Sequence, residues 1–506
     1  MSKNILDIEL PPEIKPLIDI TDILEFSPAF TQDEHHELVD TASHLICEHI
    51  HSSSLHMSNP TFYDNIYEEV FELLIQQLIP THNYNIEDEL HQILNEAFHI
   101  IFTTVVPRRS YKQSFIRKNI NYTTILNKLK HIKSKPQPDQ RTSEWYEFRY
   151  NSLTASSAWK AFGSQSLINQ LIYEKCRPLD ISKYSRFNTS SPLHHGQKYE
   201  PVSVAYYERK YGLKVDEFGC IQHDKYSFLA ASPDGIVVSE DNPRFGRMLE
   251  IKNIVNRKIT GIPKEEYWIQ MQLQMETCNL NECDFLETRF CEYESKEEFE
   301  KDGTFNTSAD RKPKGIIMYY IIDGFPYYEY APYLCSEEEF RLWEEEMMEK
   351  HKEHTWNHNI YWKMDQVSCV LVLRNKLWFK EAIKVLENVW YTILHERENG
   401  YEHRAPSTRL KSKQSSIISE NKLFDNIVLL NSNNNDNNTE IIEENKQPLC
   451  LLDLEQINND NLSNSIDLDM DTNHLNEDNI KIIKPRPLKQ QKIKKVELLF
   501  NFDNDI

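Results

Sequence analysis

The chain has 506 residues, of which 39% are hydrophobic and 27% are charged, and its formal net charge at pH 7 is −22. This length predicts two to three folded units, and the hydrophobic content is sufficient for a buried core. The acidic excess argues against a protein that coats nucleic acid, because phosphate binding favours a basic surface. Any contact with nucleic acid is therefore expected in a local basic groove or through metal ions.

The cysteines argue against a disulfide-stabilised secreted protein, and the hydropathy pattern argues against a membrane protein. Nine cysteines form no CxxC pair and no dense framework, which favours free thiols in an intracellular, reducing compartment. Cys278, Cys283 and Cys291 form a loose group, but their spacing fits no usual zinc site. Because no run of about 18 apolar residues occurs, we expect a soluble chain without a membrane partner.

The first part of the chain reads as helical. Apolar residues recur at helical spacing over residues 62–79 and 86–102, so residues 1–105 are predicted to form a helical accessory region. Residues 106–139 are basic and end in a proline-containing segment, which predicts a linker. The basic side chains of this stretch are equally consistent with contacts to DNA phosphates and with a solvated helix face.

Residues 140–335 change to a mixed α/β pattern. We expect strands at residues 220–223, 227–233, 247–254, 283–290 and 315–322, and helices at residues 154–176, 194–211 and 264–278. Residues 336–403 are predicted to return to helix. Residues 404–506 are of low complexity with a basic end, and we expect most of this tail to be disordered because it has too little apolar surface to fold.

Two apolar segments, SFLAASPDGIVV and RMLEIKNI, carry the clearest chemical signal. If they form adjacent strands, Asp234 ends one strand and Glu250 lies on the next. Glu250 and Lys252 are two residues apart and would share a face of the strand. Charged groups within apolar strands need partners, and carboxylate oxygens are ligands that Mg²⁺ or Mn²⁺ prefers. Taken alone, however, this triplet is a weak signal, because a surface strand with a salt bridge also explains it.

Three neighbouring segments make the pattern more specific. RTSEWYEFRYNSLTAS and HHGQKYEPVSVAYYERKYG precede the two strands, and EEYWIQMQLQM follows them. Together the five segments, over roughly residues 140–290, resemble the λ-exonuclease/YqaJ viral recombinase family of the PD-(D/E)XK nuclease superfamily. The resemblance implies an α/β (α+β) restriction-endonuclease-like nuclease core, with a mixed central sheet flanked by helices, in residues 140–335. Residues 336–403 would be the helical C-terminal part of that core.

The resemblance also implies roles for individual residues. The expected metal ligands for one or two Mg²⁺ (or Mn²⁺) ions are the side chains of Asp234, Glu250 and Glu200 and the backbone carbonyl of Ile251. Lys252 would be the catalytic lysine. Gln270 would orient the lysine or the attacking water, and Gln272, the second glutamine of the helix, is a weaker candidate.

A second group of residues would recognise the DNA end. Arg149, Ser156 and Ser232 match positions that hold a terminal 5′ phosphate in relatives, and an arginine suits a phosphate through paired hydrogen bonds. Ser156 is also a candidate helix N-cap. Asp224 is a weaker candidate for an acidic residue important for activity.

The function implied by the resemblance is a Mg²⁺-dependent DNA exonuclease, acting 5′→3′ on double-stranded DNA ends in viral-type recombination or repair. A structure-selective endonuclease of the same superfamily and a non-catalytic DNA-binding or packaging protein remain alternatives. A single-strand annealing protein and further copies of the chain are candidate partners. For a viral protein, the host cytoplasm, the nucleus and the virion are all open as locations.

Overall fold

The computed structural model describes residues 29–78, 86–117, 121–138, 140, 142–180 and 188–406, which belong to one compact unit, Met1–Arg409. The tail expected from residue 404 onward lies outside the described residues from residue 407. None of the described helices combines the length and the apolar character needed to cross a membrane.

The first described elements are helices, as the apolar spacing predicts. They are α2 (Gln32–Ser52), the 3₁₀ turn η2 (Ser54–Ser58), α3 (Phe62–Leu78) and α4 (Glu87–Thr104). In α3, Phe62, Ile66, Val70 and Leu74 are buried at a spacing of four, which is one face of a helix. Thr31 caps α2: its side chain accepts a hydrogen bond from the backbone N–H of Glu34, and the Glu34 carboxylate accepts one from the backbone N–H of Thr31.

The stretch expected as a basic linker contains a helix that packs on the core. This helix, α5 (Tyr122–Ser134), buries Leu129 and Ile132, while its polar face forms ion pairs such as Lys133 with Asp216 (2.7 Å). The Gln137 side chain then accepts a hydrogen bond from the backbone of Gly219 (2.8 Å). Residues 121–138 are therefore part of the folded unit.

The expected helix over residues 154–176 is divided in the structure. A short strand β1 (Leu153–Thr154) leads into α7 (Ala155–Ala158) and the 3₁₀ turn η3 (Trp159–Phe162), and only then does α8 (Gln165–Cys176) begin. The break falls at Gly163 and Ser164, both of which have extended backbones. α6 (Ser143–Tyr150) precedes β1, and Thr142 caps it.

The expected mixed sheet is confirmed and has seven strands in the order β2-β5-β6-β7-β10-β8-β9. Its strands are β2 (Val215–Asp216), β5 (Gly235–Val237), β6 (Met248–Asn253), β7 (Glu282–Glu292), β8 (Lys314–Ile322), β9 (Phe325–Tyr330) and β10 (Thr355–Leu373). Among the described strands of this sheet, β6 and β7 are the parallel pair, and helix α10 (Glu265–Cys278) connects them. A small second sheet has the order β1-β4-β3, with β3 (Ile221–Gln222) and β4 (Leu229–Ala231).

Helices cover both faces of the sheet around β6 and β7. Leu249 and Ile251 point to α9 (Pro192–Tyr211) and pack with Tyr207. On the other face, Phe285 packs against Tyr267 of α10. Since alternate residues of a strand face opposite sides, Glu250 and Lys252 lie on the α10 side of β6.

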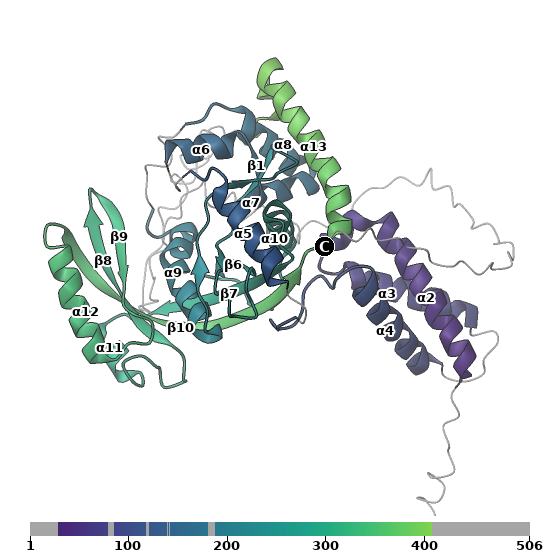
Figure 1. The fold of residues 1–506 in the computed structure, drawn as a ribbon, viewed down its shortest axis with the longest axis horizontal. Helices are drawn as coiled ribbons and strands as arrows, with labels where there is room; N and C mark the ends of the chain where they lie inside the picture. Colours follow the sequence, from purple (N-terminus) through teal and green to yellow (C-terminus); the bar gives the residue numbers. More distant parts are fainter. Residues whose placement is uncertain are drawn as a thin grey trace, which may run out of the picture. The chain divides into compact units, whose positions relative to one another are not determined.

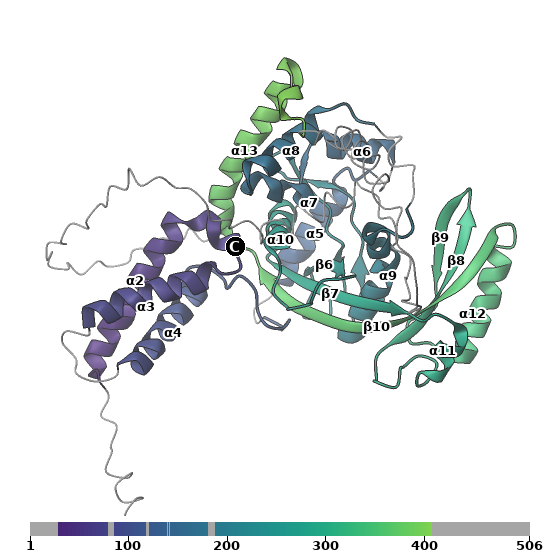
Figure 2. The same ribbon diagram turned by 180° about the vertical axis from the view of Figure 1, so that it is seen from behind.

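The helical prediction for residues 336–403 is wrong in its middle third. α12 (Glu337–Lys350) and α13 (Lys376–Asn399) are helices, but Thr355–Leu373 is the 19-residue strand β10. β10 pairs with β7 along the core and continues outward to pair with β8, beside α11 (Lys296–Lys301) and α12 (Figure 1, Figure 2). The register shifts between Met364 and Gln366, which breaks the alternation that identifies a strand.

Candidate active site

Asp234 and Glu250 meet through the pairing of β5 with β6. Asp234 directly precedes β5, and Gly235 pairs with Leu249 of β6. Asp234 Oδ2 accepts a hydrogen bond from the backbone N–H of Ile251 at 2.6 Å. The expected neighbour of β6, the run over residues 227–233, instead contains β4 of the small sheet, so the predicted strand pairing was wrong in this detail. Pro233 and Asp234 separate the two strands.

Glu250 is fully buried and receives three side-chain donors. Lys252 Nζ and Gln270 Nε2 (2.7 Å) donate to Oε1, and Gln274 Nε2 (2.7 Å) donates to Oε2. Lys252 and Glu250 therefore share a face of β6, as their spacing predicts. The three donors fix the orientation of the Glu250 carboxylate.

Like charges gather around Asp234. Burial, then Glu250 and Glu200, raise the pKa of the Asp234 carboxyl well above its ordinary value. Although burial alone would lower it, Glu250 and Asp234 raise the pKa of Lys252 above its ordinary value. Lys252 is therefore an ammonium ion at neutral pH, and it compensates only part of the acidic charge of the site.

Asn253 links the site to helix α9. Its side chain donates to the carbonyl of Gly196 at 2.6 Å and accepts from Ser203 (2.8 Å) and Thr288 (2.6 Å). The link holds the α9 backbone of Gly196, one turn before Glu200, against β6. Sequence reasoning missed Asn253, although it directly follows Lys252.

The three glutamines of α10 divide between two faces. Gln270 and Gln274 are four residues apart and both bind Glu250, and Gln274 also donates to the carbonyl of Ser232 (3.1 Å). Gln272 points away: it donates to the carbonyl of Leu373 (2.9 Å) and accepts from the backbone of Asn375 (2.7 Å). The structure thus places Gln274, and not the expected Gln272, beside Glu250.

The expected metal ligands have the right chemistry for a hard cation. Asp234 and Glu250 supply carboxylate oxygens on one side of the sheet, and Glu200 is close enough to raise the pKa of Asp234. The described residues contain no preformed cluster of three or more His, Cys, Asp or Glu side chains. Two carboxylates with a carbonyl and water still suffice for Mg²⁺, which usually keeps several waters. Because the acidic charge exceeds that of Lys252, these residues fit a divalent cation.

Arg149 and Ser156 are brought together, with Arg149 Nη2 donating to Ser156 Oγ at 3.4 Å. The Arg149 guanidinium stacks over the Trp145 ring at 4.4 Å. The Ser232 hydroxyl is buried without a conventional hydrogen-bond partner among the described residues. Cys220 connects these groups, because Arg149 and Ser232 both lower the pKa of its thiol while burial raises it. The three residues expected to bind the terminal phosphate therefore lie around one polar site, next to Cys220.

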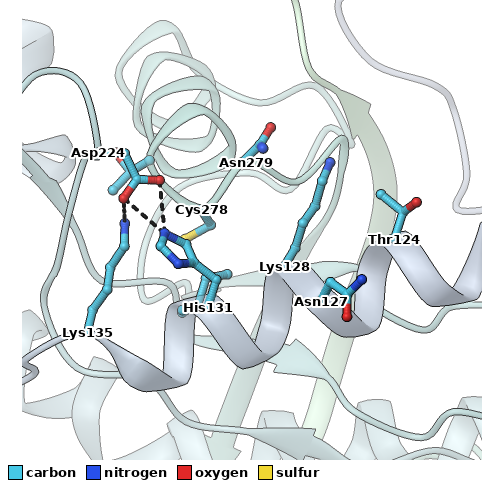
Figure 3. Close-up of a pocket in the computed structure, with 10 residues that line it drawn as sticks. Thr124, Asn127, Lys128, His131, Lys135, Asp224, Cys278 and Asn279 are labelled. Atoms are coloured by element: carbon cyan, nitrogen blue, oxygen red, sulfur yellow. Dashed lines mark hydrogen bonds and ion pairs between the residues drawn. The ribbon is translucent and has the colours of Figure 1, made fainter. Parts of the chain in front are cut away.

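Asp224 lies in a different place. It forms ion pairs with Lys135 (2.7 Å) and His131 (3.0 Å), which extend from α5 toward it (Figure 3). These groups line a pocket of about 310 Å³ with Lys128, Cys278 and Asn279. The contacts of Asp224 are thus structural ones to α5, away from Glu250. His194 forms a hydrogen bond with the Tyr328 hydroxyl at 2.6 Å.

Comparison with known proteins agrees with the motif reading. Residues 144–281 match the family model of the YqaJ-like viral recombinase domain. An uncharacterised protein of Acanthamoeba polyphaga mimivirus is 31% identical over 331 residues, and the match covers 58% of each chain. The chain thus spans under two thirds of the length of this relative.

Two solved structures are also similar over about half of the chain. An alkaline exonuclease from Laribacter hongkongensis is 21% identical, with a TM-score of 0.29 and coverage of 52% of this chain and 95% of that one. A phage-related exonuclease from Haemophilus somnus is 14% identical, with a TM-score of 0.27 and coverage of 48% and 96%. TM-scores this low do not establish a common fold.

Proposed function

We propose that the chain is a metal-dependent DNA exonuclease, because residues 144–281 match the family model of the YqaJ-like viral recombinase domain. The observation that carries the proposal is the buried Glu250 carboxylate, held by Lys252, Gln270 and Gln274 next to Asp234. Burying this much charge is costly, and a divalent cation offsets it. A protein that only binds DNA has no need of such a group.

In the proposed reaction, water attacks a phosphodiester bond and releases a nucleotide. Asp234, Glu250, the Ile251 carbonyl and Glu200 are the residues that would hold Mg²⁺ or Mn²⁺, and the ion would supply a lowered pKa for water and positive charge to offset that of the phosphate. Lys252, being protonated, stabilises negative charge that develops on the phosphate oxygens. Gln270 and Gln274 keep the Glu250 carboxylate in a single orientation.

The 5′→3′ direction rests on the group around Arg149. A guanidinium donates two hydrogen bonds to a phosphate, and Ser156 and Ser232 add hydroxyl groups at the same place. A terminal 5′ phosphate bound there would set the polarity of digestion. We propose duplex DNA ends as substrate and viral recombination or repair as context, in keeping with a mimivirus relative. A single-strand annealing protein and further copies of this chain are proposed partners.

The alternative is a structure-selective endonuclease with the same metal site. Digestion of linear duplexes with and without a 5′ phosphate, beside a covalently closed circle, separates the two. An exonuclease degrades the phosphorylated linear duplex fastest and leaves the circle intact, and Arg149→Ala removes the preference for the phosphate. Cutting of the circle at a comparable rate would establish the endonuclease instead.

A further inference from the structure

Cationic side chains from three helices lie at the polar site that contains Arg149. Arg149 lies near the end of α6, Lys175 at the end of α8 and Arg397 near the end of α13. Lys175 Nζ donates to the backbone carbonyl of Arg149 at 2.5 Å, and Arg397 Nε donates to that of Lys175 at 2.9 Å. These contacts place three positive side chains around the same stretch of backbone.

The three cations lack a carboxylate as an ion-pair partner among the residues that the structure describes. In the described part of the chain, Arg149, Lys175 and Arg397 bind carbonyl and hydroxyl oxygens or aromatic rings, without forming an ion pair. The neighbouring carboxylate of Glu174 is engaged by Lys160 at 3.0 Å. A partly buried group of like charges without a counter-ion is costly, and an anion would relieve that cost.

Lys175 is the member of the group that can change its charge. Burial, then Arg149 and Arg397, lower the pKa of Lys175 to about 7, while Glu174 and Cys220 act in the opposite direction. Near neutral pH, Lys175 is therefore the side chain whose protonation changes the positive charge of this group of cations.

Two hydroxyl groups near Arg149 add hydrogen-bond donors for an anion. Ser156 is exposed and lies next to the Arg149 guanidinium, and the Ser232 hydroxyl has no conventional partner in the part of the chain described. Cys220 lies between these groups, but a thiol is only a weak hydrogen-bonding partner. A phosphate monoester, with three acceptor oxygens and close to two negative charges at pH 7, matches this arrangement.

We propose that Lys175 is the proton-accepting residue of the cation cluster formed by Arg149, Lys175 and Arg397. Lys175 takes up a proton from solvent when a terminal phosphate monoester binds beside Arg149. The proposal rests on the proposed function and adds a pH-dependent residue to it. Before the phosphate binds, Lys175 loses its charge as the pH rises through about 7. Binding above that pH therefore requires proton uptake, and the affinity for the phosphorylated end falls by up to about tenfold per pH unit.

The test is calorimetric binding of a blunt duplex, with a 5′ phosphate or a 5′ hydroxyl, to the full chain in the presence of a chelator that prevents hydrolysis. Measuring at pH 8 in two buffers of different ionisation enthalpy gives the number of protons taken up. We expect proton uptake with the phosphorylated duplex alone. It should disappear in Lys175→Met and persist in Lys214→Met, a control at a side chain that is 77% exposed.

Lys175→Arg provides an independent check if Lys175→Met folds poorly. Arginine remains charged, so this variant should keep the preference for the phosphorylated duplex but lose its decline above pH 7. A wild-type preference for the phosphate without proton uptake would overturn the role of Lys175 and leave the proposed exonuclease intact. Equal binding of both duplexes would overturn the phosphate pocket as well, and with it the proposed 5′→3′ polarity.

Discussion

Gln272 and Gln274 lie two residues apart on α10, yet they contact different parts of the molecule. Gln274 donates to the catalytic candidate Glu250, whereas Gln272 joins the end of β10 to the start of α13. A helix turns by 100° per residue, so Gln270 and Gln274 share a face while Gln272 does not. Helical geometry alone could have selected Gln274 from the sequence.

This difference predicts opposite results for two matched substitutions. Gln274→Leu should lower kcat, because Glu250 loses one of its three donors, with a smaller effect on stability. Gln272→Leu should lower the free energy of unfolding by about 1–3 kcal/mol, because two buried backbone groups lose their partner. Chemical denaturation and a nuclease assay on both variants test this. If both variants lost the same fraction of activity for a given loss of unfolding free energy, the proposed difference between Gln272 and Gln274 would be contradicted.

The charge around Asp234 predicts that the metal site weakens the fold when no metal is bound. Asp234→Asn removes a carboxylate whose pKa Glu250 and burial raise, so we expect the metal-free protein to gain about 1–2 kcal/mol in stability. Wild type should in turn gain about 2.7 kcal/mol at a Mg²⁺ concentration roughly 100 times Kd.

Thermal unfolding with and without Mg²⁺ measures both effects. The Asn variant should melt at higher temperature than wild type in chelator and gain little from the metal. An Asn variant that is less stable than wild type in chelator, and is stabilised equally by Mg²⁺, would contradict this account of the site.

At the scale of elements, strand spacing gave the main residues of the site and helix period gave most of the helices. Glu250 and Lys252 could be placed because residues two apart share a strand face, and Asp234 because it adjoins a segment that pairs with their strand. The strand β10 could not be predicted, because its register shift at residue 365 interrupts the alternating pattern of a strand and helices lie on either side of it. The contribution of Asn253 depends on the packing of α9 against β6, and that of Lys175 on the ends of α6, α8 and α13. Such contacts arise only when distant segments fold together.

The link between β6 and α9 predicts a defect in positioning. Asn253→Ala removes the bonds to Gly196, Ser203 and Thr288, so we expect a loss of about 1–3 kcal/mol in stability. Because Gly196 lies one turn before Glu200, kcat should fall while the Kd for DNA changes little. Steady-state kinetics with a separate binding titration test this. A fall confined to DNA affinity would show that Asn253 does not act through the site.

At the scale of the whole molecule, the net charge of −22 implies that positive charge for DNA must be concentrated locally. Arg149, Lys175 and Arg397 form such a concentration without ion pairs in the described residues. The N-terminal helices belong to the same folded unit, since Trp378 Nε1 donates to the carbonyl of Leu55 (3.2 Å) and Ser58 to Glu265 (2.6 Å). The sequence predicted the helical region but not its contacts with α10 and α13.

The most direct test of the central claim is digestion of linear duplex DNA with Mg²⁺ by wild type, Lys252→Ala and the control Lys384→Ala. Lys384 lies on the exposed side of α13, pairs with Glu381 and is remote from any proposed role. We predict that wild type and the control degrade the duplex, that chelation stops both, and that Lys252→Ala is slower by roughly 10²–10³-fold. If Lys252→Ala degrades DNA as fast as the control, or wild type leaves it intact with either Mg²⁺ or Mn²⁺, the proposed nuclease site is contradicted.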